Sequence, residues 1–196
     1  MPHDNPAVRR HQPTSYNSFP ERTAFPLMAL AQHHGLPTLF LDWTRRAWIA
    51  AYFAAADAAA WLSQKRQTDS SQAGNTARLA VWALCRQTDR DERSFPRGDY
   101  GIYEAPASTN PNLRAQNGLF VWWSSEEDLA FEEHIEWVAQ RYDVHVNLRR
   151  FLLPVGQASR LLRLLALEHI DGAAMFPGVD GVVRAMRERT LWDSAL

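Results

Sequence analysis

The sequence predicts a mixed α/β fold, of the α+β or α/β class, with a small central sheet of about four strands flanked by helices. Helical and strand-like patterns alternate along the chain, and no internal repeat is present. The apolar share of 46% and the charged share of 22% are typical of a globular protein. A length of 196 residues is that of a single domain with a substantial core.

The N-terminal part predicts an arm followed by a helix. Residues 1–20 are rich in Pro, His, Asn and Ser without an apolar period, so we expect a flexible arm in front of one domain at 21–196. A helical pattern starts at residue 21. Gly35 is suited to end that helix in a left-handed conformation, and Pro37 blocks its continuation.

The next stretch predicts a strand, a long helix and a second strand. Residues 38–42 form a short apolar run after a turn, which indicates a buried strand. Residues 45–67 are dominated by Ala and other helix formers, with Thr44 as the N-cap. A polar loop at 68–76 then leads to an alternating, branched run at 78–85 that predicts a strand.

The second half begins with an irregular segment. Residues 86–118 are first charged and then rich in Pro, Asn and Gly, and a loop of that length in a compact domain tends to be functional or flexible. The remaining predicted elements are strands at 119–124 and 147–154 and helices at 125–142, 157–168 and 179–189.

Composition excludes several classes of protein. A net charge of -1 gives no basis for generic nucleic-acid binding. No segment resembles a signal peptide or a membrane span, and Cys85 is the single cysteine, so we expect a cytoplasmic protein without disulfides or membrane partners. Cys85 ends an apolar strand and is expected to be a small buried residue. Phosphate-loop, dinucleotide, hydrolase and zinc-peptidase motifs are all absent.

His33 and His34 lie in the last turn of the first predicted helix. There an imidazole can cap free carbonyl groups and interact with the helix dipole, which is a structural role. Because the two side chains point about 100° apart on a helix, at most one is expected to face a pocket. Together with Asp42 and His134 they lack the spacing of a known metal motif, so we predict no metal site.

Asp42, Trp43 and Thr44 stand where a buried strand gives way to a helix. Groups at such strand ends often face a cleft. The alternative is that the Asp42 carboxylate accepts hydrogen bonds from the first amides of the following helix, alongside Thr44. Trp43 is large for a strand end and can provide a wall on which a flat ring stacks, although with eight tryptophans most must belong to the core.

These residues form a pattern that resembles the FRG domain, a bacterial and phage-borne family named for a Phe/Tyr-Arg-Gly motif. The three pieces occur in order: Gln32 to Thr38, Leu41 to Thr44 and Ala50 to Ala54. Two later segments, Asn112 to Phe120 and Met175 to Gly181, resemble the family's Gln-x-Gly-x-Phe and Phe-Pro-x-x-Asp-Gly segments. The resemblance thus extends over most of the chain.

The name-giving triplet itself is missing from residues 1–31, and Arg97-Gly98 follows the Gln-His block instead of preceding it. We therefore expect the N-terminal strand of the family's fold to be missing, either because the sequence starts late relative to a longer gene product or because this is a trimmed relative that lost part of its site. The order of the remaining motifs is similar to that of ADP-ribosyltransferases, which bind NAD through a strand Arg, a Ser/Thr step and a later Glu. Without the upstream Arg, transfer activity is expected to be weak or absent.

The resemblance implies a pocket for a nucleotide-type ligand, with NAD as the candidate cofactor. Such a site needs a cation, an aromatic wall and a carboxylate, for which Arg114, Trp43 and either Asp42 or Glu104 are candidates. Two groups of residues are assigned to this pocket: His33, Asp42 and Thr44 for catalysis, and Gln32, His34, Trp43, Arg114 and Gln116 for ligand binding.

Two functions are compatible with these motifs. The first is that of an ADP-ribosyltransferase-like enzyme of a bacterial toxin or phage-defence system, acting on a small nucleotide ligand. The second is that of a non-catalytic module that binds a protein partner, or of an inactive relative, in which the same residues only hold the corner between helix and strand together. The second is favoured by the missing triplet.

Overall fold

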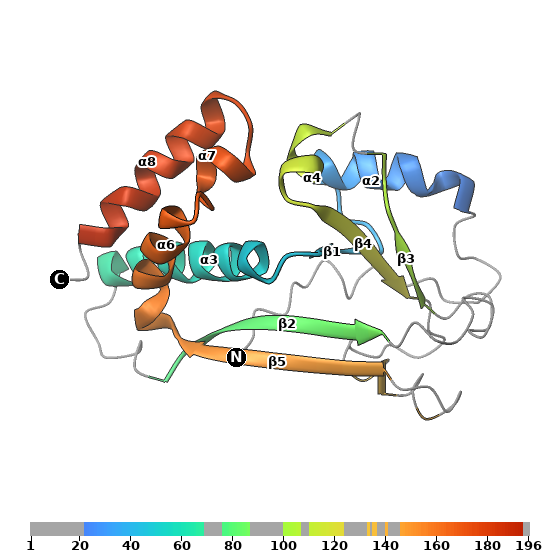
Figure 1. Cartoon of the computed structure of the whole chain (residues 1–196), viewed down its shortest axis with the longest axis horizontal. Helices are drawn as coiled ribbons and strands as arrows, with labels where there is room; N and C mark the ends of the chain where they lie inside the picture. The colour runs from blue at the N-terminus through green and yellow to red at the C-terminus, as the bar shows by residue number, and fades with distance from the viewer. Residues whose placement is uncertain are drawn as a thin grey trace.

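We describe the fold from a computed structural model of the 196-residue chain. The structure describes residues 22–68, 76–86, 100–106, 110–123, 133, 135–136, 140 and 146–193. These residues contain six α-helices and five strands, and the strands form two small antiparallel sheets (Figure 1). The predicted mixed α/β class is confirmed.

The first sheet contains three strands in the order β1-β4-β3, which are Phe40–Thr44, Gly118–Trp123 and Tyr100–Tyr103. Residues paired across antiparallel strands project from the same face. One face therefore carries an aromatic layer, and α2 (Phe25–His33) and α4 (Pro111–Ala115) contribute to the core on this side. The residues of this cluster are Phe25, Ala29, Phe40, Leu113, Phe120 and Trp122.

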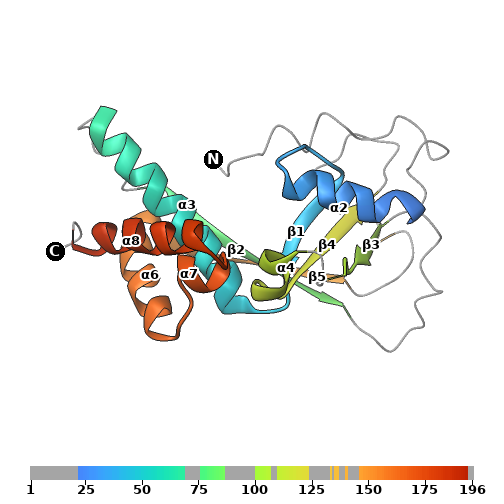
Figure 2. The same ribbon diagram turned by 90° about the horizontal axis from the view of Figure 1, so that it is seen from above.

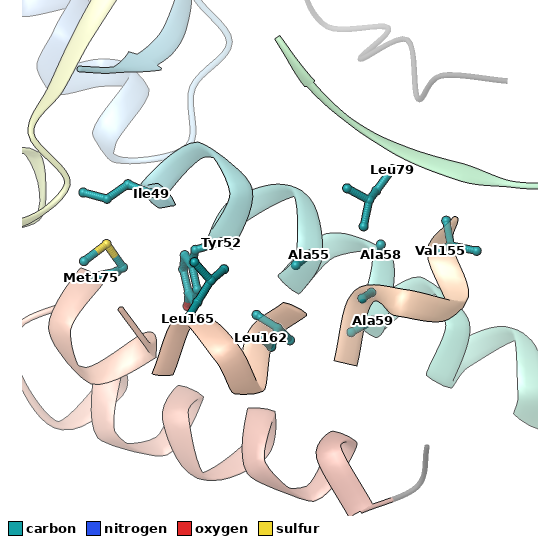
Figure 3. Close-up of a cluster of buried hydrophobic side chains, with 11 residues drawn as sticks. Ile49, Tyr52, Ala55, Ala58, Ala59, Leu79, Val155, Leu162, Leu165 and Met175 are labelled. Atoms are coloured by element: carbon teal, nitrogen blue, oxygen red, sulfur yellow. The ribbon is translucent and has the colours of Figure 1, made fainter. Parts of the chain in front are cut away.

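The second sheet pairs β2 (Arg78–Arg86) with β5 (Val146–Pro154). The long helix α3 (Ala47–Thr68) lies against it, and the short turn η4 (Val155–Gln157) leads from β5 into α6 (Ala158–Leu167). Side chains from α3, α6 and the sheet fill the space between these elements (Figure 3). The second core is thus rich in Ala, which allows α3 and α6 to approach closely.

The C-terminal helices α7 (Gly172–Met175) and α8 (Val179–Asp193) pack tightly on one another. A Cβ atom at Gly181 would lie 1.8 Å from the carbonyl oxygen of Phe176, so this helix pair requires glycine there. The buried Glu188 of α8 accepts hydrogen bonds from the Tyr52 hydroxyl of α3 (2.5 Å) and from the Gly172 amide (3.0 Å). Figure 2 shows these helices at the opposite end of the molecule from α2 and β3.

Several predicted elements differ from the structure. The prediction of one central sheet of about four strands is wrong, because the described strands divide into two sheets. The predicted loop at 86–118 contains β3 and α4, and α3 begins at Ala47 instead of residue 45. The prediction that Cys85 is buried is wrong. Cys85 is exposed, because it lies near the end of the two-stranded sheet.

The predicted arm at 1–20 lies outside the described residues, as does most of the helix expected at 125–142. The left-handed conformation predicted for Gly35 is confirmed by its φ of 82°. A turn of 3-10 helix, η2 (Arg22–Ala24), precedes α2. Within the described parts of the chain, we find no helix with the length and apolar character needed to cross a membrane.

Candidate functional site

A chain of hydrogen bonds connects the end of α2 to strand β1. The backbone amide of Phe40 donates to the Thr38 hydroxyl (3.1 Å), and that hydroxyl donates to the side-chain oxygen of Gln32. The Gln32 amide nitrogen is then oriented to donate to the carboxylate of Asp42. We call Gln32, Thr38 and Asp42 the polar corner.

Asp42 has an unusual environment for a residue that water can reach. It is exposed as a residue, yet the protein atoms around its carboxyl group raise the pKa of Asp42 above its ordinary value. The hydrogen bond from Gln32 lowers this pKa by a smaller amount. The two observations agree if water reaches the carboxyl from one side while protein replaces water on the others.

The structure does not support the alternative in which Asp42 caps helix α3. Gln32 is the hydrogen-bond partner of its carboxylate among the described residues. The amide of Arg46, the residue just before α3, donates instead to the Thr44 hydroxyl (3.1 Å). Asp42 therefore retains acceptor sites that the described fold does not use.

His33 is held by Asn110, the N-cap residue of α4. The Asn110 side chain caps α4 by accepting a hydrogen bond from the Leu113 amide (3.1 Å), so its oxygen is occupied. Its amide nitrogen lies 3.1 Å from Nδ1 of His33 and must be the donor. Nδ1 is therefore the acceptor, and the neutral ring carries its proton on Nε2.

Thr44 and Gln116 bridge the two cores. The Thr44 hydroxyl donates to the Gln116 carbonyl oxygen (2.8 Å), and the Arg45 amide donates to the carbonyl oxygen of Asn117 (3.2 Å). The Gln116 side chain in turn donates to the carbonyl oxygen of Met175 at the end of α7 (3.1 Å). The bond to Met175 attaches the first sheet to α7 in the second core, and the bond from Thr44 holds Gln116 against β1, so both residues have a structural role.

Other predicted site residues are not gathered around Asp42. Strand alternation places Trp43 on the opposite face of β1 from Asp42. Arg114 is exposed on α4, and no described contact connects it to the polar corner. His34 is also exposed, with its ring packed edge-on against His33 at 5.2 Å. Glu104 forms an exposed ion pair with Arg45.

Thr38 and Asn110 are site residues that were not predicted from the sequence. Thr38 stands directly after a proline and two residues before β1, where its hydroxyl can accept a hydrogen bond from the amide of the first strand residue. Asn110 precedes Pro111, and Asn followed by Pro is a typical helix start. In the part of the chain that the structure describes, no group of three or more His, Cys, Asp or Glu could hold a metal ion.

Comparison with known proteins supports one relationship. Neither a search of curated proteins nor a search of solved structures found a match to this chain. The family model described as FRG domain matches residues 5–61, which include the polar corner and α3 as far as Trp61. The later segments at 112–120 and 175–181 lie outside the match, so their resemblance rests on their motifs alone. The predicted relationship is confirmed for its N-terminal part: residues 5–61 of this chain match the FRG domain.

Proposed function

We propose that the chain binds a nucleotide-type ligand at the polar corner, with NAD as the first candidate. The observation that carries this proposal is the state of Asp42, a desolvated carboxylate on an exposed residue that, among the described residues, is held by the side chain of Gln32. An ionised carboxylate has about four acceptor sites, so most of them are available to a ligand. A carboxylate of this kind suits the paired hydroxyls of a ribose.

Neighbouring groups can complete such a site. His33, next in the chain to Gln32, carries an Nε2 proton that is available for donation, because its Nδ1 is the acceptor for Asn110. Arg114 has no described contact to the polar corner, but it lies on α4, whose N-cap residue Asn110 contacts His33, so it is the candidate cation for a more distant phosphate group. A ring bound at Asp42 would not stack on Trp43, which projects from the other face of β1.

The enzymatic form of this proposal is ADP-ribosyl transfer from NAD, in the toxin or phage-defence setting that the family resemblance implies. Asp42 would orient the ribose and His33 would donate a hydrogen bond. Thr44 is a weaker candidate for chemistry, since its hydroxyl already donates to Gln116 and accepts from Arg46. Binding is therefore the first property to test, and transfer the second.

The test is a calorimetric and thermal-shift titration with NAD, ADP-ribose and adenosine monophosphate. A ligand that binds only the folded state must raise the melting temperature. At a ligand concentration a hundredfold above Kd, the free energy of unfolding rises by about 2.7 kcal/mol. We expect saturable binding that Asp42→Asn abolishes. Glu168→Gln, which removes an exposed carboxylate at the end of α6, is the matched control and should bind normally.

A second comparison tests the chemistry of recognition. Adenosine monophosphate and its 2′,3′-dideoxy form differ only in the ribose hydroxyls that Asp42 is proposed to accept. On the normal chain, we expect the dideoxy compound to bind much more weakly than adenosine monophosphate. On the Asp42→Asn variant, we expect the two compounds to bind equally weakly. Equal binding of the two compounds by the normal chain would contradict the assigned role of Asp42.

One observation favours a second function, that of a non-catalytic module. The motif residues Thr44 and Gln116 form bonds that hold the two cores together, as expected if part of the signature serves the fold. If no nucleotide shifts the melting temperature, this alternative is the better account. The Asp42 carboxylate would then serve recognition of a protein partner.

A further inference from the structure

Helix α8 has an apolar stripe on its outer face. Its inner face is buried, with Gly181, Ala185 and Glu188 packed against α7 and the rest of the second core. The outer face carries apolar side chains at the spacing i, i+3, i+4 and i+7, which places them on one side of a helix. They are Val179, Val182, Val183 and Met186, which are 79%, 52%, 40% and 62% exposed.

Single exposed apolar residues are common, but four on one helix face form a continuous patch. Both views place α8 at the outside of the molecule, away from the three-stranded sheet (Figures 1 and 2). We name the four residues the α8 stripe. The α8 stripe has the form of a helix surface that packs on another helix.

We propose that the α8 stripe is an interface through which two copies of the chain associate, with their α8 helices antiparallel. This inference is independent of the ligand proposed above. In an antiparallel pair related by a two-fold axis, the same flank of each helix faces its counterpart. The charges on that flank must therefore be complementary to themselves.

Asp180 and Arg187 meet this requirement. They are seven residues apart, which is close to two full turns, so both lie on the same flank of the α8 stripe. With the two-fold axis close to Val183, Asp180 of each copy lies opposite Arg187 of the other. The pair forms twice by symmetry. In a parallel arrangement this flank would instead face the opposite flank of the other copy, so Asp180 and Arg187 could not pair with one another.

The neighbouring cation does not compete for this arrangement. Arg184 packs over the ring of Phe176 at 3.9 Å within its own copy, so it is engaged away from the two-fold axis. Four side chains and two ion pairs are fewer than a stable interface of about 800 Å² per partner contains. We therefore expect a dimer that dissociates on dilution.

The test is sedimentation velocity of the full chain over a wide range of concentrations. We expect a monomer–dimer equilibrium that Val182→Glu abolishes. The control is Leu27→Glu on α2, which introduces the same charge at a side chain that is 69% exposed outside the α8 stripe, and which should dimerise normally. A chain that is monomeric at every concentration, or a Val182→Glu variant that dimerises like the control, would overturn the proposal.

A charge exchange tests the orientation. Asp180→Arg and Arg187→Asp, made singly, each create two like-charge pairs and should weaken the dimer by roughly tenfold, while the double variant should restore it. Circular dichroism checks that each variant keeps its helix content. Failure of the double variant to recover, with the fold intact, would contradict the antiparallel pairing.

Crosslinking supplies an independent readout of the same geometry. In a Cys85→Ser background, Val183→Cys should form an intermolecular disulfide because it lies close to the two-fold axis. Val179→Cys should not, because the antiparallel arrangement separates its two copies by more than a disulfide can span. Efficient crosslinking through position 179 would indicate a parallel pair and overturn the proposal.

Discussion

Asp42 on strand β1 takes its hydrogen bond from Gln32, which lies near the end of helix α2. The orientation of the Gln32 amide is fixed in turn by Thr38, whose hydroxyl donates to the Gln32 side-chain oxygen. The side-chain amide of Gln32 thus connects the Thr38 hydroxyl to the Asp42 carboxylate. This relationship makes Thr38 a positioning residue for Asp42.

Replacing Thr38 by Val should raise the pKa of Asp42 further. The hydrogen bond from Gln32 lowers that pKa, and without the Thr38 hydroxyl nothing in the polar corner holds the Gln32 amide in the donating orientation. An NMR titration of the Asp42 carboxyl carbon measures the change directly, without any ligand. Thr38→Ser keeps the hydroxyl and should titrate like the normal chain. An unchanged pKa in Thr38→Val would exclude the positioning role.

The pH dependence of stability should reveal Asp42 as well. Because its folded pKa is raised, the folded chain binds more protons than the unfolded chain between the ordinary value of 3.8 and the raised value. Stability therefore falls as the pH rises through that window. Asp42→Asn lacks this loss, so its melting temperature should equal or exceed that of the normal chain near pH 7. A marked loss of stability at pH 7 would instead assign Asp42 a structural role.

Thr44→Val should destabilise the chain without affecting the polar corner. It removes the bond to the Gln116 carbonyl and leaves the Arg46 amide without its acceptor, a loss of about 1–3 kcal/mol in the free energy of unfolding. Urea denaturation measures this change. Thr190→Val on α8, whose hydroxyl donates to a carbonyl of its own helix, is a matched control with a smaller expected effect. Equal losses in both variants would argue against the role of Thr44 in holding Gln116 and the start of α3.

The tautomer of His33 is a direct prediction from the Asn110 cap. The ring should carry its proton on Nε2 at a pH where it is neutral, because Nδ1 accepts from the Asn110 amide. Nitrogen NMR distinguishes the two ring nitrogens. In Asn110→Asp the cap is preserved while the amide donor is lost, so the preference for this tautomer should weaken. A ring protonated on Nδ1 in the normal chain would contradict the assigned bond.

The sequence predicted the elements whose signals are local. Gly35 and Pro37 mark the end of α2, and the Ala-rich run predicts α3, because each depends on the preferences of neighbouring residues. The division into two sheets is not local, since β1 pairs with β4 far along the chain. No pattern within a single strand identifies its partner in the sheet.

For the candidate site, too, the sequence predicted which residues matter but not the contacts between distant segments. The motif identified Gln32, Asp42 and Thr44 as special, yet only the pairing of the elements shows that the Thr44 hydroxyl holds Gln116, the residue that bonds to the second core. The alternation of side chains along a strand was enough to predict that Trp43 and Asp42 project from opposite faces of the sheet. Thr38 acquires its role through Gln32, six residues earlier in the chain, and a contact across a turn of this kind has no signal in composition or periodicity.

Tyr52→Phe should change how the chain responds to alkali. The Tyr52 hydroxyl is buried, and desolvation followed by its bond to Glu188 raises the pKa of Tyr52 far above its ordinary value of 10.0. Above pH 10 the unfolded chain loses this proton while the folded chain keeps it, so stability falls as the pH rises. Tyr52→Phe should be less stable at pH 7 by about 1–3 kcal/mol, because Glu188 loses a buried partner.

The two effects separate in a single series of urea denaturations between pH 7 and pH 11. The normal chain should lose stability above pH 10 more steeply than the Tyr52→Phe variant, so the difference between them narrows as the pH rises. Tyr103→Phe is the comparison: the pKa of this partly buried side chain on the three-stranded sheet is raised by desolvation alone, so the same change above pH 10 should be smaller than for Tyr52→Phe. Parallel curves for the normal chain and Tyr52→Phe would show that Tyr52 does not keep its proton. The Tyr52–Glu188 bond would then not explain how α8 is anchored to α3.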